Sequence, residues 1–216
     1  MYNFTIPMAL MDYVPVIFFG VTAVLLLQDL YNKMSKAAYS LLAAGGINVF
    51  LAGFCKATWK LLYAANICDF VALEEMFMPV NSLGLLFVGI SLLMAVIGKG
   101  KNALLTIAPL PRGLVPVPFT SSMPFIMMMV VGLGGMCTGL SIMAARMKKG
   151  KVMILFILSF VCAMAMGYMS SQDSTQAWVN WAEQTINTVS QLCLMLGVIA
   201  LHKAGLKDRS WQETRV

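Results

Sequence analysis

The sequence predicts an all-α integral membrane protein, built as a bundle of seven transmembrane segments. Of its 216 residues, 60% are hydrophobic and only 11% are charged, and the mean hydropathy is +0.82. So few charges cannot cover a water-exposed surface, because soluble domains carry about 25% charged residues. The composition therefore excludes a soluble enzyme, a nucleic-acid-binding domain and a disordered chain, and it makes the lipid bilayer a necessary partner.

Six apolar runs are long enough to cross a bilayer as regular helices, which takes roughly 20 residues each. The N-terminus before the first run has no basic segment, carries Asp12 and offers no small-residue cleavage site, so we expect a retained helix rather than a cleaved signal peptide. The six runs are 13–31, 38–63, 76–97, 123–144, 151–169 and 176–201.

Basic residues between the runs predict the orientation. They form four clusters, after the first, third, fourth and sixth runs, whereas the two remaining loops are acidic and hold neither lysine nor arginine. The positive-inside rule places all four clusters in the cytoplasm. We therefore expect a multi-pass protein of the cell membrane, with its N-terminus outside and its C-terminus in the cytoplasm. The clusters are Lys33 and Lys36, then Lys99 and Lys101, then Arg146, Lys148, Lys149 and Lys151, and finally Lys203, Lys207, Arg209 and Arg215.

This orientation requires one more crossing within the Pro-rich segment 98–122. Only one clear helix separates the clusters that follow the third and fourth runs, although both are assigned to the cytoplasm. The segment is apolar but contains four prolines and Arg112, which oppose a regular helix and require shelter by protein at membrane depth. We expect a broken, centrally packed segment. The alternative is a six-helix protein in which 101–122 lies on the membrane surface.

An internal duplication is suggested by a shift of 109 residues, which aligns 13–15 with 122–124 and Glu74 with Glu183. Sequence identity across this shift is weak, so the duplication rests on pattern alone. Two three-helix halves joined by an odd linker would be parallel repeats, an architecture found in transporters such as SWEETs. The single membrane domain, 1–216, then divides into a first half at 13–97, the linker segment at 98–122, a second half at 123–201 and a cytoplasmic tail at 202–216.

The last apolar run carries a polar face of Asn180, Glu183, Gln184, Asn187 and Gln191, which recur at helical spacing. Glu183 lies roughly 10 Å from the start of the run at 1.5 Å per residue. Ionisable groups at such depth usually face a cavity or a partner, so this glutamate is the predicted functional carboxylate. Interhelical hydrogen bonding is the structural alternative for the amides.

A second polar stripe on the run 38–63 includes Lys56 and Trp59, and Lys56 is the predicted partner of Glu183. Lys60, one turn higher, is expected to snorkel to the surface. A static ion pair that fixes helix packing, and an interfacial belt for the tryptophans, are the structural alternatives. The predicted substrate-binding residues are Glu183, Lys56, Asn187, Gln191, Trp59, Trp181, Asn81 and Asn180.

Catalytic and metal-binding patterns do not accompany this face. The sequence has no HExxH, GxSxG or HxxxD pattern, its five cysteines form no CxxC pair, and it has one histidine. We therefore expect no enzyme, no metal and no cofactor. The predicted function is a transporter or permease for a small polar or cationic solute, with its site in the outer half of the bundle. The alternative is a seven-helix sensor or accessory subunit of a membrane complex, and a lipid-acting membrane enzyme is the third. The partner that we expect beside the solute and the bilayer is a second copy of the chain or a membrane partner subunit.

Overall fold

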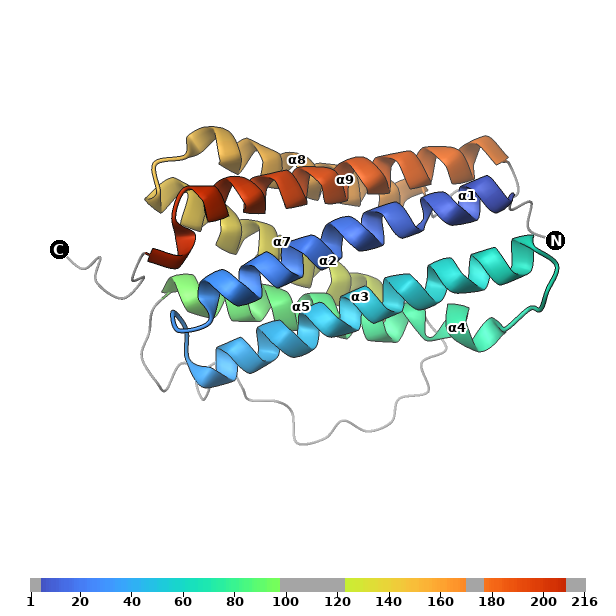
Figure 1. The fold of residues 1–216 in the computed structure, drawn as a ribbon, viewed down its shortest axis with the longest axis horizontal. Coiled ribbons are helices and arrows are strands. Elements are labelled where there is room, and N and C mark those ends of the chain that lie inside the picture. The colour runs from blue at the N-terminus through green and yellow to red at the C-terminus, as the bar shows by residue number, and fades with distance from the viewer. Residues whose placement is uncertain (1–4, 98–122, 170–176, 209–216) are drawn as a thin grey trace.

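The computed structural model describes residues 5–97, 123–169 and 177–208. These residues form helices joined by short turns, and helices make up nearly all of the described chain (Figure 1). The helices are α1 (Ile6–Met11), α2 (Tyr13–Leu30), α3 (Lys36–Ala64), α4 (Val71–Glu75), α5 (Phe77–Ile97), α7 (Met123–Arg146), α8 (Gly150–Met169), α9 (Ala177–Lys203) and the short 3-10 helix η1 (Leu206–Asp208).

Six helical stretches are long and apolar enough to cross a membrane, so the chain is a multi-pass membrane protein. They confirm the six apolar runs expected from the sequence. The first stretch begins earlier than expected, at Ile6, because α1 continues into α2 with a break of one residue. The predicted seventh segment, 98–122, lies outside the described residues.

Local sequence signals explain where several helices begin and end. Pro79 and Pro124 occupy the first turns of α5 and α7, where the missing N–H costs no hydrogen bond. Ser35 caps α3 by accepting a hydrogen bond from the Ala38 N–H at 3.2 Å. Asn66 and Lys148 adopt positive φ after α3 and α7, and paired backbone bonds there close Schellman-type ends.

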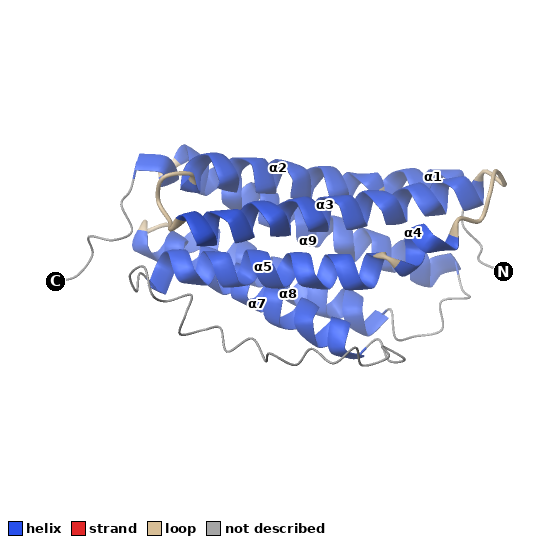
Figure 2. Ribbon diagram, turned by 90° about the horizontal axis from the view of Figure 1, so that it is seen from below, coloured by secondary structure: helices blue, strands red, loops and turns tan. Residues whose placement is uncertain are grey.

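The six spanning helices form a closed ring in the order α2, α3, α5, α7, α8, α9, with α9 returning to α2. The axes of all six helices lie roughly along the long axis of the bundle in both views (Figure 1, Figure 2). The first three helices of the ring belong to the expected first half and the last three to the expected second half. The halves therefore meet at two interfaces, α5 with α7 and α9 with α2.

Both of these interfaces join parallel helices. A Cβ added to Gly132 of α7 would meet the backbone of Leu85 on α5, and one added to Gly139 would meet Leu92 at 3.0 Å. Contact positions thus advance together along the two helices. At the other interface Asp29, near the end of α2, contacts His202, near the end of α9. In each half, by contrast, neighbouring helices are antiparallel (Figure 1).

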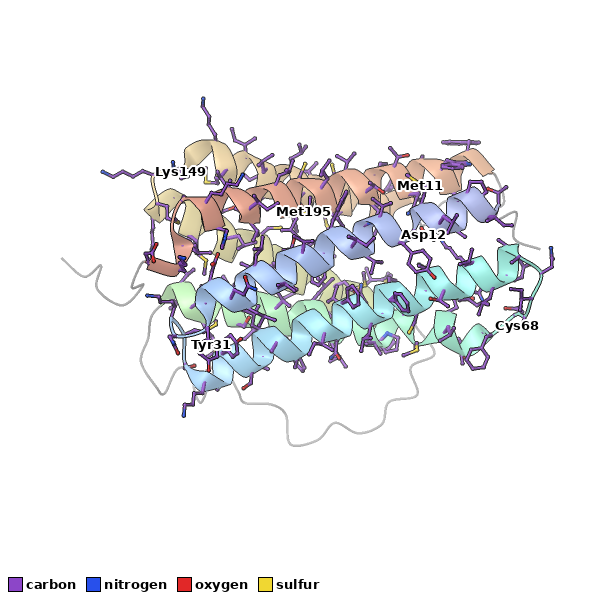
Figure 3. The ribbon with its side chains drawn as sticks, viewed as in Figure 1. Met11, Asp12, Tyr31, Cys68, Lys149 and Met195 are labelled. Carbon is purple, nitrogen blue, oxygen red and sulfur yellow. The ribbon has the colours of Figure 1, made fainter. Side chains whose placement is uncertain are left out.

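The bundle has two ends of different charge. The amino-terminal end holds α1, α4 and the start of α9, with Asp69, Glu74 and Glu75 between α3 and α5. The carboxyl-terminal end holds the α2–α3 turn, the α7–α8 turn with Lys149, and η1 (Figure 3). The described basic loop residues gather at this second end, as the charge pattern predicted. They are Lys33, Lys36, Arg146, Lys148, Lys149, Lys151, Lys203 and Lys207.

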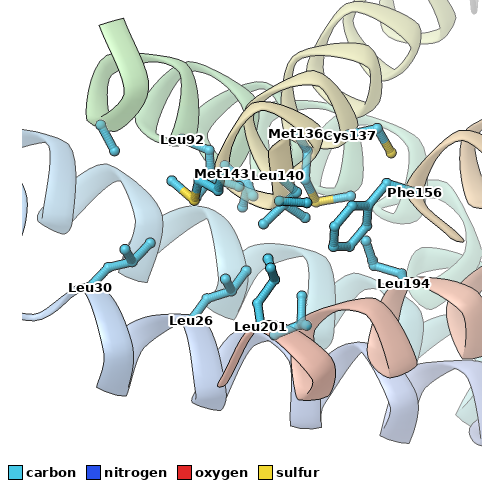
Figure 4. Close-up of a cluster of buried hydrophobic side chains, with 14 of the residues drawn as sticks. Leu26, Leu30, Leu92, Met136, Cys137, Leu140, Met143, Phe156, Leu194 and Leu201 are labelled. Atoms are coloured by element: carbon cyan, nitrogen blue, oxygen red, sulfur yellow. The ribbon is translucent and has the colours of Figure 1, made fainter. Parts of the chain in front are cut away.

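The apolar core fills the carboxyl-terminal half of the ring and leaves the other half more polar. Its cluster of buried side chains joins all six spanning helices around Leu92 and Leu140, both with no exposed surface (Figure 4). The amino-terminal half instead contains buried polar groups and a smaller number of separate buried apolar side chains. Other core members are Leu26, Leu30, Met136, Met143, Phe156, Leu194 and Leu201.

Candidate functional site

Charged side chains lie in the amino-terminal half of the bundle on α3, at the α1–α2 junction and on α9. Lys56 and Lys60 lie in the last turns of α3, Asp12 lies at the junction of α1 and α2, and Glu183 lies in the second turn of α9. At 1.5 Å per residue, Lys56 and Glu183 are roughly 9–12 Å from the ends of their helices. These charged residues therefore lie in the half of the bundle that the apolar core does not fill.

Lys56 is the electrostatic centre of this cluster. Its ammonium lies 4.1 Å from the centroid of the Phe77 ring on α5, which is a cation–π contact. Lys60, Asp12, Glu183 and Glu74 are all close enough to interact with it electrostatically. Lys56 thus links α3 to charges on α2, α4 and α9 without being bonded directly to one of them.

The direct Lys56–Glu183 ion pair expected from helical depth does not form. Among the described residues, no ion pair within 4.0 Å joins them. The reason is the ring order, because α2 lies between α3 and α9 and brings its own carboxylate to α3 first. That carboxylate is Asp12, which pairs with Lys60 at 2.6 Å, with the two side chains 11% and 17% exposed. Lys60 therefore turns inward rather than snorkelling to the surface.

The polar face of α9 contains buried atoms without hydrogen-bond partners. In the described part of the chain, Glu183 Oε1, Gln184 Nε2 and Gln191 Oε1 are buried and make no hydrogen bond. Such atoms are rare in folded proteins, and each costs about 1–3 kcal/mol. Gln184 is the most buried of these three residues. The sequence placed it on the polar face, but it is not one of the predicted substrate-binding residues.

The other predicted residues divide into buried and exposed groups. Asn81 is buried on α5, and Asn187 and Asn180 are half-buried on α9. Trp59 is 2% exposed, and its indole N–H donates to Asp69 Oδ1 at 3.0 Å, so it ties the acidic loop to α3. Trp181 is 40% exposed, which fits the alternative of an interfacial belt.

The sequence analysis missed two polar contacts that hold α2 in place. The Tyr13 hydroxyl lies 2.9 Å from Thr58 Oγ1 on α3, close to the Asp12–Lys60 pair. At the opposite end, Asp29 contacts His202. Asp12, which pairs with Lys60, and Asp29 are isolated carboxylates inside or beside an apolar run, and such a carboxylate indicates a buried partner. Their partners are 48 and 173 residues away, so spacing along the chain does not reveal them.

A small cavity lies near the centre of the ring. It lies between α2, α3, α5 and α7, and its volume of about 10 Å³ is enough for one water molecule at most. Thr22 supplies the polar side chain of its lining, and the hydroxyl already donates to the Phe18 carbonyl at 2.9 Å. Toward the carboxyl-terminal end of the bundle, the polar cluster is followed by the apolar core.

Comparison with family models, curated proteins and solved structures gives no significant match. Within the described ranges, no group of three or more His, Cys, Asp or Glu side chains is placed to hold a metal ion. The functional argument therefore rests on the arrangement of this chain's own polar groups.

Proposed function

We propose that this protein is a transporter or permease for a small polar or cationic solute, which binds in the amino-terminal half of the ring. The observation that carries the proposal is the set of three buried, unpaired polar atoms on α9, on Glu183, Gln184 and Gln191. A buried carboxylate that only stabilised the fold would be expected to have a direct partner. A solute entering this half would supply the missing hydrogen bonds.

The unpaired atoms favour a ligand that donates hydrogen bonds. Glu183 Oε1 and Gln191 Oε1 are acceptors, and one of them belongs to a carboxylate. An ammonium or a hydroxyl group can donate to either acceptor, and the two acceptors lie about 12 Å apart along α9, so they offer two successive positions for one small donor group. Gln184 Nε2 adds one donor for an accepting group on the same solute. Lys56 lies near enough to Glu183 to interact with it electrostatically, while Glu183 Oε1 makes no hydrogen bond in the described chain.

The ring order supports movement of one half against the other. Each half contributes three consecutive helices, and the two interfaces between the halves are both parallel. This is the relation expected for two repeats about an axis along the membrane normal, with the solute site between them. The proposed duplication thus gains support from helix directions, which do not depend on sequence identity.

A seventh crossing is part of the proposal. Because α5 and α7 are parallel, the end of α5 and the start of α7 lie at opposite ends of the bundle. If both helices span the bilayer, these two points lie on opposite sides of it, which requires a further crossing. The sixth span then ends on the same side as the basic loops, which the positive-inside rule assigns to the cytoplasm.

Cysteine labelling tests this topology. Cys68 is exposed at the amino-terminal end, whereas the other four cysteines lie in helices. An impermeant maleimide should label wild-type protein in intact cells and should not label C68S. In the C68S background, K149C should react only after the membrane is permeabilised. Labelling of K149C in intact cells would overturn the orientation.

Transport is tested with purified protein in proteoliposomes on a solid-supported membrane. We would apply methylammonium, ethanolamine, choline and glycerol, and measure charge displacement together with uptake of the radiolabelled solutes. The proposal expects a response to at least one of them that Glu183→Gln abolishes. Thr185→Ala is the matched control, because this exposed hydroxyl lies on the same turn and donates to the Trp181 carbonyl.

The outcomes separate transport from the alternatives. Binding that depends on Glu183 but produces no flux would favour a sensor or accessory subunit. A response that Glu183→Gln leaves unchanged would reject the site. If none of the four solutes binds or moves, the proposal of a small amine or hydroxyl solute is rejected.

A further inference from the structure

We propose that Asp29 and His202 form a proton-binding site that fastens α2 to α9 at the carboxyl-terminal end of the ring. His202 Nδ1 lies 2.8 Å from Asp29 Oδ1 and 3.0 Å from Oδ2. An ionised carboxylate can only accept hydrogen bonds, so the imidazole donates through Nδ1–H. The two residues are 173 positions apart and join the first helix of the ring to the last.

The two side chains differ sharply in exposure. The Asp29 side chain is 1% exposed, whereas that of His202 is 37% exposed. A proton can therefore reach the imidazole from solvent, and the imidazole can transmit its charge to a carboxylate that solvent does not reach. Histidine is the side chain whose ordinary titration falls between about pH 5 and 8.

The carboxylate depends on this one partner. Among the described residues, His202 supplies the ion pair to Asp29, and no other cation lies within 4.0 Å of it. The nearby elements α2, α3, α8, α9 and η1 bring further charged or titratable groups to the same end of the bundle. These are Tyr31, Lys33, Lys36, Tyr39, Lys151, Lys203, Lys207 and Asp208.

The position of the pair gives the proton a mechanical consequence. The turn after α9 folds back so that Leu206 of η1 is fully buried, and η1 contacts both α2 and α9. The Asp29–His202 pair lies under this turn and closes the α2–α9 interface. When the imidazole is protonated, its charge offsets that of the buried carboxylate and the interface is held. When the imidazole is neutral, the carboxylate keeps the Nδ1–H hydrogen bond but loses the opposing charge, and the interface is weakened.

The sign of the pH dependence follows directly. The contact between α2 and α9 is strongest at acidic pH and weakens as pH rises through the titration of His202. This inference does not require transport, because it concerns the contact between two helices. If transport occurs, the pair adds a proton-controlled gate at the end opposite the solute site.

Nitrogen-15 NMR of the protein in nanodiscs tests proton binding. The chain contains a single histidine, so ¹⁵N-histidine labelling of protein without a histidine tag gives one imidazole to follow. We expect one imidazole that responds to pH, and we expect its titration to differ in D29N, because this variant removes the carboxylate that contacts Nδ1 directly. D208N removes an exposed carboxylate at the same end and should leave the midpoint unchanged. An unchanged midpoint in D29N would overturn the proposed site.

Spin labels test the mechanical consequence. In a cysteine-replaced protein, labels at the exposed positions Gln28 and Leu196 report the distance between α2 and α9. We expect a narrow distribution at about pH 5.5 and a longer or broader one at about pH 8. H202Q should remove the difference between the two conditions. A wild-type distribution that is the same at both pH values, or a difference that persists in H202Q, would refute the gate even if transport is confirmed.

Discussion

The two interfaces between the halves differ in chemistry although both join parallel helices. At the α5–α7 interface, backbone meets backbone, since Gly89 and Gly132 leave no room for a Cβ on either helix. At the α2–α9 interface, an ion pair joins the carboxyl-terminal ends of the two helices, and α9 carries unpaired polar atoms nearer its other end. The two halves are therefore joined by close backbone packing at the α5–α7 interface and by a side-chain ion pair at the α2–α9 interface.

This contrast suggests which side moves. Close glycine packing gains dispersion energy only at one separation, so the α5–α7 interface acts as a fixed axis. An ion pair and unpaired amides can exchange their partners for protons, water or solute, so we expect the α2–α9 interface to be the one that moves. The predictions below test this contrast, beginning with the largest expected effect.

Gly132→Ala should produce the largest loss of stability. Its new Cβ would meet the backbone of Leu85 and Leu86, which cannot turn aside as a side chain can. We expect a loss at or above the upper end of the roughly 1–3 kcal/mol typical of overpacking. The midpoint of thermal unfolding in detergent measures this loss of stability, and we expect α5 and α7 to move apart in the variant.

Gly134→Ala is the matched control on the same helix. A Cβ there would lie 3.6 Å from the Phe160 ring, which is ordinary contact. Because alanine also favours the helix by about 0.5–1 kcal/mol, this variant should be neutral or slightly more stable. Equal losses for the two variants would show that the α5–α7 interface is no tighter than its surroundings.

Lys60→Met should have the next largest effect, within the first half. It leaves Asp12, which is 11% exposed, without its ion-pair partner. We expect a loss of about 1–3 kcal/mol, because a buried charged acceptor loses its donor. Asp12→Asn combined with Lys60→Met should recover most of the loss in a double-mutant cycle. Independent effects of the two substitutions would mean that the pair does not stabilise the first half.

Much of the fold could be predicted from the sequence because bilayer thickness sets a length that apolar runs reveal directly. All six runs correspond to spanning helices, and the clustering of the basic loops at one end followed from their charge. Gly135 and Gly139 have the GxxxG spacing typical of close helix packing, and a Cβ on Gly139 would meet Leu92 at 3.0 Å. What such patterns specify is local, namely length, polarity and spacing along one helix.

The side-chain partners could not be predicted, because they depend on the order of helices around the ring. Depth alone matched Lys56 with Glu183, but α2 intervenes and pairs Asp12 with Lys60 instead. The closure of α9 onto α2 also creates the Asp29–His202 pair, which no spacing rule contains. Glu183, Asn187 and Gln191 were correctly placed together on one face, but the helices that face them were not known.

Glu183→Gln should make the protein slightly more stable while removing its proposed function. The variant replaces a buried carboxylate, whose Oε1 has no hydrogen-bond partner in the described chain, with a neutral amide. We expect a gain of about 1 kcal/mol, as is common when a functional charge is removed from a costly position. Thermal unfolding without solute measures this gain. A clear loss of stability would indicate that Glu183 is a packing partner of Lys56, and it would favour the static interpretation of the site.

The smallest effect should come from Ser190→Ala, within the second half. Ser190 Oγ donates to the Ser159 carbonyl at 2.8 Å and lies 3.3 Å from Ser159 Oγ, joining α9 to α8. Hydrogen bonds between helices in membranes contribute about 0.6 kcal/mol on average, because the separated helices find other partners. We expect a loss of that size, since Phe156 packs directly against Gly197 two turns away and holds the same helices together. Thr185→Ala, which removes an exposed hydroxyl bonded within α9, should change stability less. A loss several times larger for Ser190→Ala would show that side-chain bonds, rather than packing, hold α8 to α9.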